Sequence, residues 1–194
     1  KVDSNPLLPL ADDALAIKVA SSHPEVIAAT RRIATGGMVT NREGAFSLEI
    51  IGLEPEAEQP ISLIAQHITE GRWLASNDQD SILIGRGLAD MMKAQVGHRV
   101  TLVGSDIHKQ NRQRRMSVVG SYDVGLPTNE KKTVYISLRE AQELYGLRGQ
   151  STEIQVALKQ LGTEANVIAA VAPSLPGYEV ESWEQNYPEL GTAV

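Results

Sequence analysis

The segment 81–103 constrains the fold of this 194-residue chain more than any other. It begins with a short apolar stretch at Ser81–Gly85 and continues through a Gly-x-Gly turn and an amphipathic stretch. A second glycine, Gly97, then precedes a stretch in which apolar and polar residues alternate. Apolar residues that recur every 3.6 positions indicate a helix, and strict alternation indicates a half-buried strand. The segment therefore predicts a strand, a helix and a second strand in close succession, with no obvious catalytic group among them.

Similar patterns elsewhere predict further strands and helices, which interleave without a regular strand–helix–strand repeat. Strands are predicted over 26–39, 46–53, 115–123, 133–138 and 178–183, and around the alternating residues Ile154, Val156 and Leu158. Helices are predicted over 9–22 and 163–175, along the stripe Ile61, Ile64, Ala65 and Ile68 that ends at Gly71, and from the capping pair Ser137 and Glu140 to Gly146. This mixture predicts an α+β fold, with a mixed sheet and helices.

The composition excludes several classes of function. The formal net charge of −6 argues against nucleic acid as a partner, because phosphate binding requires a basic surface. The chain has no cysteine, and therefore no disulfide, thiolate metal site or cysteine nucleophile. No apolar stretch approaches the roughly 20 residues of a membrane-spanning helix. Since the sequence begins at Lys1 without an apolar leader, we expect a processed or excised part of a longer protein.

The motifs that invite an enzymatic interpretation lack the residues it requires. Gly85-Arg86-Gly87 follows a strand as a dinucleotide-binding turn does, but Asp90 stands where the third glycine belongs, and its charge opposes a phosphate. A tight strand-to-helix turn is the interpretation that we favour. A proline-bounded linker after a predicted strand contains three acidic residues, Glu54, Glu56 and Glu58. A run of solvated carboxylates is more plausible there than a pair of carboxyl groups for acid–base catalysis.

Two pairs of residues have spacings that metal sites use. His67 and Glu70 are three residues apart on a predicted helix, but the sequence supplies no further ligand pattern, and a solvated polar face is the better interpretation. Asp78 and Asp80 are similar to the start of a calcium loop. A strand follows them directly, which indicates a charged turn.

One local feature opposes the acidic total charge. The predicted hairpin 104–115 carries four cationic residues, Lys109, Arg112, Arg114 and Arg115. One interpretation is a charged hairpin tip that resists pairing with other strand edges. The other is a contact with lipid headgroups or with an acidic partner. These four residues are the only contact surface that the sequence nominates.

The segment 81–103 also resembles the signature of one family, the extracytoplasmic (periplasmic core) domain of MacB-like ABC transporter permeases. The family pattern has Ile-Gly, Leu-Ala two residues later, Leu or Met, and then Gly-Asp before Val-x-Leu. The matching residues are Gly85, Leu88, Ala89, Met92, Gly97, Val100 and Leu102. Further blocks similar to the family follow in the right order, at 51–56, 68–74, 118–122, 134–146, 153–156 and 182–188.

The resemblance implies two subdomains and no active site. The first is a discontinuous Porter-like subdomain over 1–55 and 150–194, and the second is a Sabre-like subdomain over 56–149. No catalytic residue, metal ligand or cofactor is expected. The residues Gly85, Leu88, Ala89 and Gly97 are expected to be structural.

The resemblance also implies a location and a set of partners. Such domains lie on the extracytoplasmic face of the cell membrane, between two transmembrane helices of a dimeric permease. There they couple ATP hydrolysis in a cytoplasmic ABC ATPase subunit or domain to conformational change, for export or mechanotransmission. The expected partners are the protein's own transmembrane helices, that ATPase, a second permease copy or paralogue, and an extracytoplasmic protein or lipid substrate.

The sequence departs from the family pattern in two places. His98 stands where the family usually has Asp, which puts in doubt any hydrogen bond made there in the turn. The hairpin 104–115 lacks the length and the apolar residues of the hairpin in lipoprotein-releasing permeases, so we do not assign lipoprotein release. The alternative function is a free-standing extracytoplasmic module that binds a lipid or a peptide.

Overall fold

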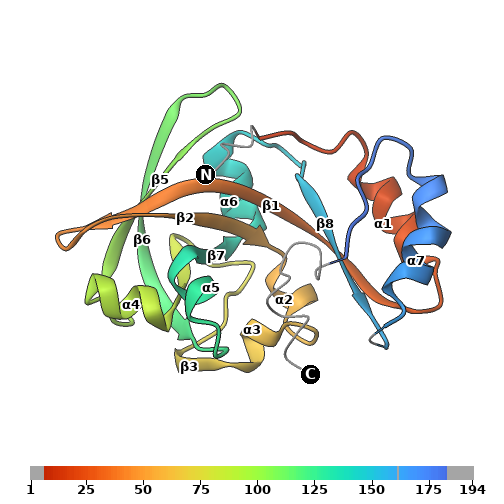
Figure 1. Ribbon diagram of the computed structural model, residues 1–194. Helices are drawn as coiled ribbons and strands as arrows, with labels where there is room; N and C mark the ends of the chain where they lie inside the picture. Colours follow the sequence, from red (N-terminus) through yellow and green to blue (C-terminus); the bar gives the residue numbers. More distant parts are fainter. Residues whose placement is uncertain (1–6, 161, 183–194) are drawn as a thin grey trace. The chain divides into compact units, whose positions relative to one another are not determined.

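The computed structural model describes residues 7–160 and 162–182 (Figure 1). They form two compact units. The central unit comprises residues 7–11 and 30–153, and the terminal unit comprises residues 12–29 and 154–182. The α+β class with a mixed sheet is confirmed. The sequence places a subdomain boundary near residue 55, whereas the structure groups residues 30–55 with the central unit because their strands pair within its sheet. The Porter-like and Sabre-like bounds stay a prediction.

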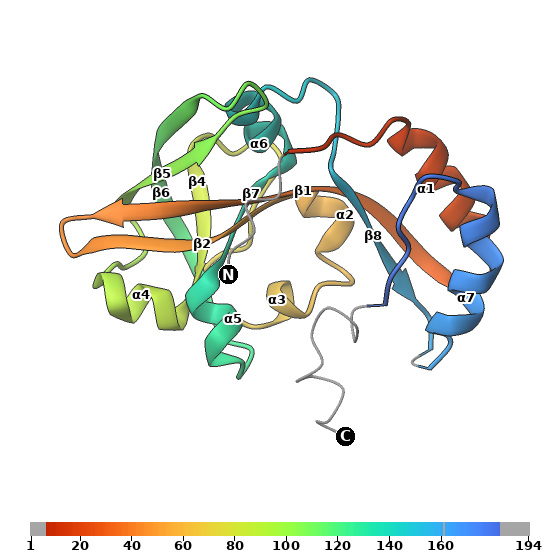
Figure 2. The ribbon, with the colours of Figure 1, turned by 45° about the horizontal axis from the view of Figure 1, so that its top comes forward.

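The sheet of the central unit closes into a ring of six strands (Figures 1 and 2). Going around the ring, the strands are β1 (Val26–Asn41), β2 (Gly44–Leu53), β7 (Thr133–Ser137), β4 (Ser81–Gly85), β6 (Asn111–Tyr122) and β5 (Arg99–Ser105). The β2–β7 and β4–β6 pairs are parallel and the others are antiparallel. The ring closes because β1 pairs with β2 through Arg32–Asn41 and with β5 through Gly37–Thr40. Closure leaves no free edge in these strands where they pair.

Successive side chains of a strand point to opposite faces of the sheet, and the apolar side chains on the two faces form two separate hydrophobic cores. Ile50 and Ile84 belong to the core inside the ring, with Leu88 and Met92 of α4 (Arg86–Met92). Their neighbours Ile51 and Leu83 point the other way, into a second core with Trp73, Leu74, Tyr122 and Tyr135. Each strand there is apolar on both faces, as expected of a strand that is covered on both sides.

Helix α6 (Leu138–Tyr145) packs on the ring where two glycines leave room for it. A Cβ atom on Gly52 would lie 2.5 Å from the Cβ atom of Ala141, and one on Gly104 would lie 2.9 Å from the ring of Tyr145. The helix begins as the sequence predicts, because the Ser137 hydroxyl accepts a hydrogen bond from the Glu140 amide at 3.2 Å. It ends at Gly146 in the left-handed conformation, with φ 75°.

The terminal unit combines both ends of the described chain. It contains α1 (Asp13–Ser21), the first residues of β1, most of β8 (Glu153–Leu158), α7 (Glu164–Val171) and the short 3-10 helix η1 (Ala172–Ser174). The helices α1 and α7 lie side by side in both views (Figures 1 and 2). The Tyr178 hydroxyl donates a hydrogen bond to the Asp12 carbonyl at 2.8 Å, which joins the two ends of the unit.

Three local predictions were wrong. The stripe that predicts a helix up to Gly71 forms only the single turn α3 (Leu63–Gln66), because the following residues form β3 (Ile68–Gly71) and pair with β6. The proline-bounded linker contains a further helical turn, α2 (Pro55–Glu58). Residues 178–182 form no strand, and Trp183 lies outside the described residues. Helix α5 (Pro127–Lys132) has no counterpart among the predicted helices.

Candidate interaction surface

The hairpin β5–β6 carries the four predicted contact residues, and its tip is held rigidly. The carboxylate of Asp106 accepts hydrogen bonds from the amides of His108 and Gln110, both at 2.9 Å, and from Arg112 Nε at 2.7 Å. The Ile107 amide donates to the Tyr145 carbonyl at 3.1 Å, which ties the tip to the end of α6. The hydrogen bond from Arg112 holds the pKa of Asp106 below its ordinary value. The hairpin is therefore a fixed element rather than a loose hook.

Two of the four cations are neutralised by neighbouring carboxylates. Arg112 forms an ion pair with Asp106. Arg114 lies 3.1 Å from Asp80 on the turn before β4 and 3.5 Å from Glu143 on α6. Both arginines share the inward side of β6 with the fully buried Met116, since residues of the same parity point to one face of a strand. These two residues therefore stabilise the hairpin, and the sequence alone did not distinguish them from the other two.

The remaining two cations are exposed. Arg115 points to the opposite side of β6, and Lys109 lies at the tip in the left-handed conformation, with φ 60°. Neither forms an ion pair with another residue in the described part of the chain. The register adds a residue that is not among the four predicted contact residues. Arg99, exposed on β5, pairs with Ser117 of β6 and lies on the same face as Arg115.

The four residues of the strand–helix–strand motif have structural positions. Leu88 is fully buried in the inner core and Ala89 packs against it. Gly85 is required by close packing, because a Cβ atom there would lie 2.1 Å from the Glu130 carbonyl oxygen. Gly97 has φ 93°, which favours glycine. His98, which replaces the family's Asp, still makes a turn hydrogen bond: its Nδ1 accepts from the Gln95 amide at 3.0 Å.

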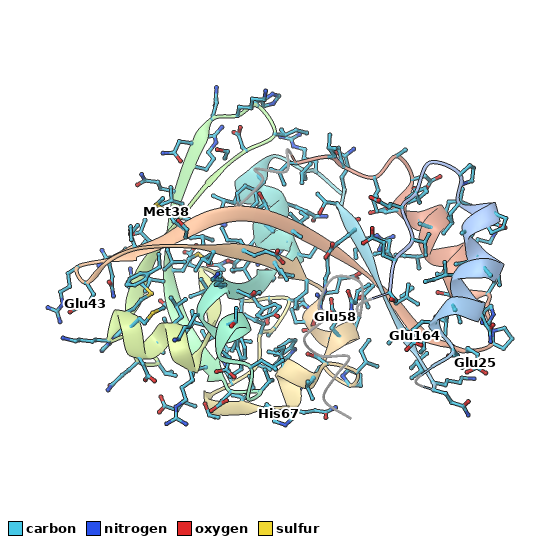
Figure 3. All side chains as sticks on the ribbon, viewed as in Figure 1. Glu25, Met38, Glu43, Glu58, His67 and Glu164 are labelled. Atoms are coloured by element: carbon cyan, nitrogen blue, oxygen red, sulfur yellow. The ribbon has the colours of Figure 1, made fainter. Side chains whose placement is uncertain are left out.

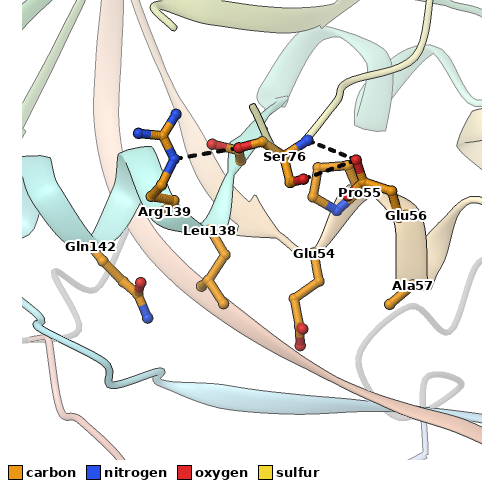
Figure 4. Close-up of a pocket in the computed structure, with 9 residues that line it drawn as sticks. Glu54, Pro55, Glu56, Ala57, Ser76, Leu138, Arg139 and Gln142 are labelled. Atoms are coloured by element: carbon orange, nitrogen blue, oxygen red, sulfur yellow. Dashed lines mark hydrogen bonds between the residues drawn. The ribbon is translucent and has the colours of Figure 1, made fainter. Parts of the chain in front are cut away.

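A shallow cleft of about 350 Å³ lies between α2, the loop at Ser76 and the start of α6 (Figure 4). The Glu56 carboxylate accepts hydrogen bonds from both the amide and the hydroxyl of Ser76, each at 2.9 Å. The bond from the Ser76 amide is the main reason that the pKa of Glu56 lies below its ordinary value, which makes this carboxylate a weak base. Arg139 donates to the carbonyl oxygens of Ser76 and Asp78. This cleft therefore offers no activated nucleophile.

A second carboxyl group, Glu140 of α6, is buried within the central unit. Its side chain is 2% exposed, and neither oxygen accepts a hydrogen bond of good geometry from a described residue. Burial raises the pKa of Glu140 to about 6, against the opposing influence of the Ser81 backbone and the Arg114 charge. Because the group does not line the cleft, it cannot act on a bound molecule there.

The residues whose spacing is similar to that of metal sites make ordinary structural contacts. His67 Nδ1 lies 2.8 Å from the Leu63 carbonyl oxygen. Asp78 accepts hydrogen bonds from Arg72 and from the Ala75 amide, as a residue of a charged turn does. Among residues 7–160 and 162–182, no group of three or more His, Cys, Asp or Glu side chains could hold a metal ion. Within the same residues, no helix is long and apolar enough to cross a membrane.

The acidic run was interpreted wrongly for one of its members. Glu58 is 2% exposed and forms an ion pair with Arg32 of β1, so it is a buried structural residue. Glu54 accepts a hydrogen bond from the Arg31 amide at 2.7 Å, and only Glu56 lies on an exposed surface. The sequence gives no sign of this, because the partner residues are more than 20 positions away.

Comparison with solved structures shows the same fold in bacterial transporters. The extracellular domain of the ABC-type transporter YknZ from Gram-positive bacteria has a TM-score of 0.61 and 12% identity, covering 89% of this chain and 87% of that chain. The periplasmic region of MacB from Actinobacillus actinomycetemcomitans has a TM-score of 0.59 and 13% identity, covering 96% and 86%. A domain of a putative permease protein from Porphyromonas gingivalis has a TM-score of 0.53 and 18% identity, covering 90% and 79%.

Sequence comparison gives the family. No curated protein matches the chain in sequence. The sequence profile of the MacB-like periplasmic core domain, however, matches residues 3–174, which include the strand–helix–strand motif and parts of both compact units. The chain thus belongs to the family of MacB-like periplasmic core domains.

Proposed function

We propose that this chain is the extracytoplasmic part of an ABC transporter permease, and that it couples ATP hydrolysis on the cytoplasmic side to conformational change outside the membrane. The observation that carries the proposal is the family match over residues 3–174. The partners in this proposal are the protein's transmembrane helices, an ABC ATPase subunit or domain, and a second permease copy or paralogue. An extracytoplasmic protein or lipid is the proposed substrate.

The architecture suits a part that transmits motion. A ring closed by hydrogen bonds, with a core on each face, resists internal deformation because packed interiors are only slightly compressible. The 16-residue strand β1 has no break and supplies residues to both units: Val26–Ala29 belong to the terminal unit and Thr30–Asn41 to the central unit. A closed, densely packed ring of strands moves as a rigid body rather than bending continuously.

Spin labels on the full-length permease test the coupling directly. The domain has no cysteine, so a single substitution, His108→Cys in the central unit or Leu15→Cys in the terminal unit, gives one labelling site in this domain for each copy. Both positions are exposed, Leu15 by 49%. With any other cysteines of the permease removed, the distance between labels on the two copies should change when ATP is added, because the coupling moves the domains.

The ATP-dependent change needs a matched control. A permease whose ATPase cannot bind nucleotide should keep one distance distribution with and without ATP. If the functional permease also keeps one distribution at both positions, the domain does not respond to nucleotide and the coupling proposal is wrong. The alternative, a lipid- or peptide-binding module, would then be favoured by a ligand that raises the melting temperature of the chain.

A further inference from the structure

We propose that the outer face of β1, β5 and β6 around Arg99 and Arg115 is a docking surface for an acidic segment of a partner protein. This surface, called here the arginine face, consists of Met38, Thr40, Arg99, Thr101, Val103 and Arg115. It goes beyond the coupling role, because a domain could transmit motion without binding any protein at this place.

The strand register places these side chains on one face. Across the three strands, Thr40 pairs with Thr101, and Thr101 pairs with Arg115. One step along, Met38 pairs with Val103. The intervening residues Val39 and Leu102 are fully buried inside the ring, so the residues of the arginine face point away from it. Figure 3 marks Met38 on β1.

The two arginines are close together and uncompensated. Arg99 pairs with Ser117, so it is the diagonal neighbour of Arg115, at about 7–8 Å between backbones. Neither arginine forms an ion pair with another described residue, although like charges this close repel. The acidic residue Glu49 lies on the same face of β2 and pairs with Gly36 of β1. Gly36 is two positions along β1 from Met38 and four from Thr40, so Glu49 lies away from the end of the face that carries the arginines.

The contrast with the inner side of the same hairpin is informative. Arg112 and Arg114 have carboxylate partners in Asp106, Asp80 and Glu143. The hairpin therefore pairs its inward cations within the chain, whereas the described residues leave the donors of Arg99 and Arg115 available. Arginine binds carboxylates through two parallel hydrogen bonds, and the adjacent hydroxyls of Thr40 and Thr101 supply further donors.

The surface fits an acidic protein segment better than a membrane. Neither hydrophobic core includes Met38 or Val103, which are partly exposed beside the arginines and offer an apolar contact. Protein interfaces combine such apolar contacts with arginine. Binding to anionic lipid requires clusters of about four to eight cations, and the arginine face has two.

Titration with an acidic peptide tests the docking surface. The probe is a labelled decapeptide of alternating Glu and Leu, and binding to this chain is followed by fluorescence anisotropy at low salt. We expect the Arg99→Glu/Arg115→Glu variant to bind about tenfold more weakly or worse, and Arg99→Lys/Arg115→Lys to bind at an intermediate level, because lysine lacks the paired donors. Amide shifts in nuclear magnetic resonance spectra should be largest on β5 and β6.

A charge-matched variant separates the surface from the total charge. Arg148→Glu/Lys159→Glu changes the net charge by the same amount at two exposed positions elsewhere, and it should bind like the parent chain. Equal losses in both double variants, or no peptide binding by the parent, would overturn the proposal. Phosphatidylglycerol vesicles form the second arm: binding to vesicles but not to peptide, abolished by the Arg99/Arg115 variant, would identify a lipid surface and also overturn it. None of these outcomes depends on ATP-driven coupling.

Discussion

Arg32 on β1 donates hydrogen bonds to the carboxylate of Glu58 on α2 from two nitrogen atoms: its single Nε–H group is shared between Oε1 and Oε2, at 3.1 Å from each, and Nη2 donates to Oε1 at 2.5 Å. The Glu58 side chain is 2% exposed and that of Arg32 16% exposed. The pair fixes α2 against the ring through a contact that joins two segments 26 residues apart.

Removing one partner of this pair should cost more than removing both. Glu58→Ala leaves a largely buried guanidinium without its carboxylate, which should lower the free energy of unfolding by about 3 kcal/mol. Arg32→Met/Glu58→Leu replaces both charges by apolar groups and should recover most of that loss. Urea denaturation followed by circular dichroism measures both. Exposed substitutions change the free energy of unfolding by up to about 0.5 kcal/mol. If Glu58→Ala changes the free energy of unfolding by no more than that, the pair contributes little.

The sequence predicts the central motif well and the acidic run poorly, for one physical reason. The strand–helix–strand motif is specified locally: apolar periodicity sets Ser81–Gly85 and α4, and Gly97 sets the turn before β5. The role of Glu58 depends instead on Arg32, which only the folded chain brings near. The division of the hairpin cations into paired and unpaired residues has the same origin, because Asp80 and Glu143 lie on other elements.

The ring could not be predicted for a related reason. Each strand pattern indicates a strand, but closure depends on β1 pairing with β5 as well as with β2, and pairing between distant strands leaves no local signal. The helix predicted up to Gly71 failed although its apolar stripe is clear, because pairing of Ile68 with Tyr122 outweighs the helical pattern. Tertiary context overrides local propensity in this way.

The two glycines of the Gly-x-Gly turn should respond oppositely to alanine. A Cβ atom on Gly85 would lie 2.1 Å from the carbonyl oxygen of Glu130 and 2.6 Å from the Cα atom of Glu130. Because both are backbone atoms, Gly85→Ala must displace the backbone and should lower the free energy of unfolding by about 1–3 kcal/mol. On Gly87 the nearest atom is Cγ of the Lys131 side chain at 2.9 Å, which can move. Since Gly87 lies within α4, alanine there should be neutral or should stabilise the helix by up to about 1 kcal/mol. Thermal unfolding of the two variants checks the contrast, and equal shifts would refute it.

The buried carboxyl of Glu140 should make stability depend on pH. Burial raises its pKa from 4.5 to about 6 in the folded chain, so the folded state holds this proton more tightly than the unfolded state. The contribution is present in full below pH 4.5 and is lost as the pH rises through 6. The charged groups around it are Arg114, Asp80 and Arg139, of which Asp80 adds to the upward shift and the arginines oppose it.

Glu140→Gln should therefore increase stability at pH 8 by about 1–2 kcal/mol relative to its effect at pH 4.5, because the neutral amide avoids burying a charge. Urea denaturation at the two pH values measures the difference. The exposed substitution Glu181→Gln is the control for removing a carboxylate at the surface. An identical effect of Glu140→Gln at both pH values would mean that the carboxyl is solvated in the folded chain.

The tip of the β5–β6 hairpin should lose its order when Asp106 is replaced. Its carboxylate accepts hydrogen bonds from the His108 and Gln110 amides and from Arg112, so Asp106→Ala removes all three while leaving the strands paired. We expect hydrogen exchange at the His108 and Gln110 amides to become much faster, with no comparable change at the Val100 and Leu102 amides in the middle of β5. Asp106→Asn keeps one acceptor oxygen and should retain part of the protection. The pKa of Asp106 is lowered in the folded chain because Arg112 donates a hydrogen bond to the charged carboxylate. Protonating Asp106 at low pH should therefore weaken its three hydrogen bonds and accelerate exchange at the His108 and Gln110 amides, relative to the Val100 and Leu102 amides. Unchanged protection at the tip in Asp106→Ala would show that the backbone turn alone holds it.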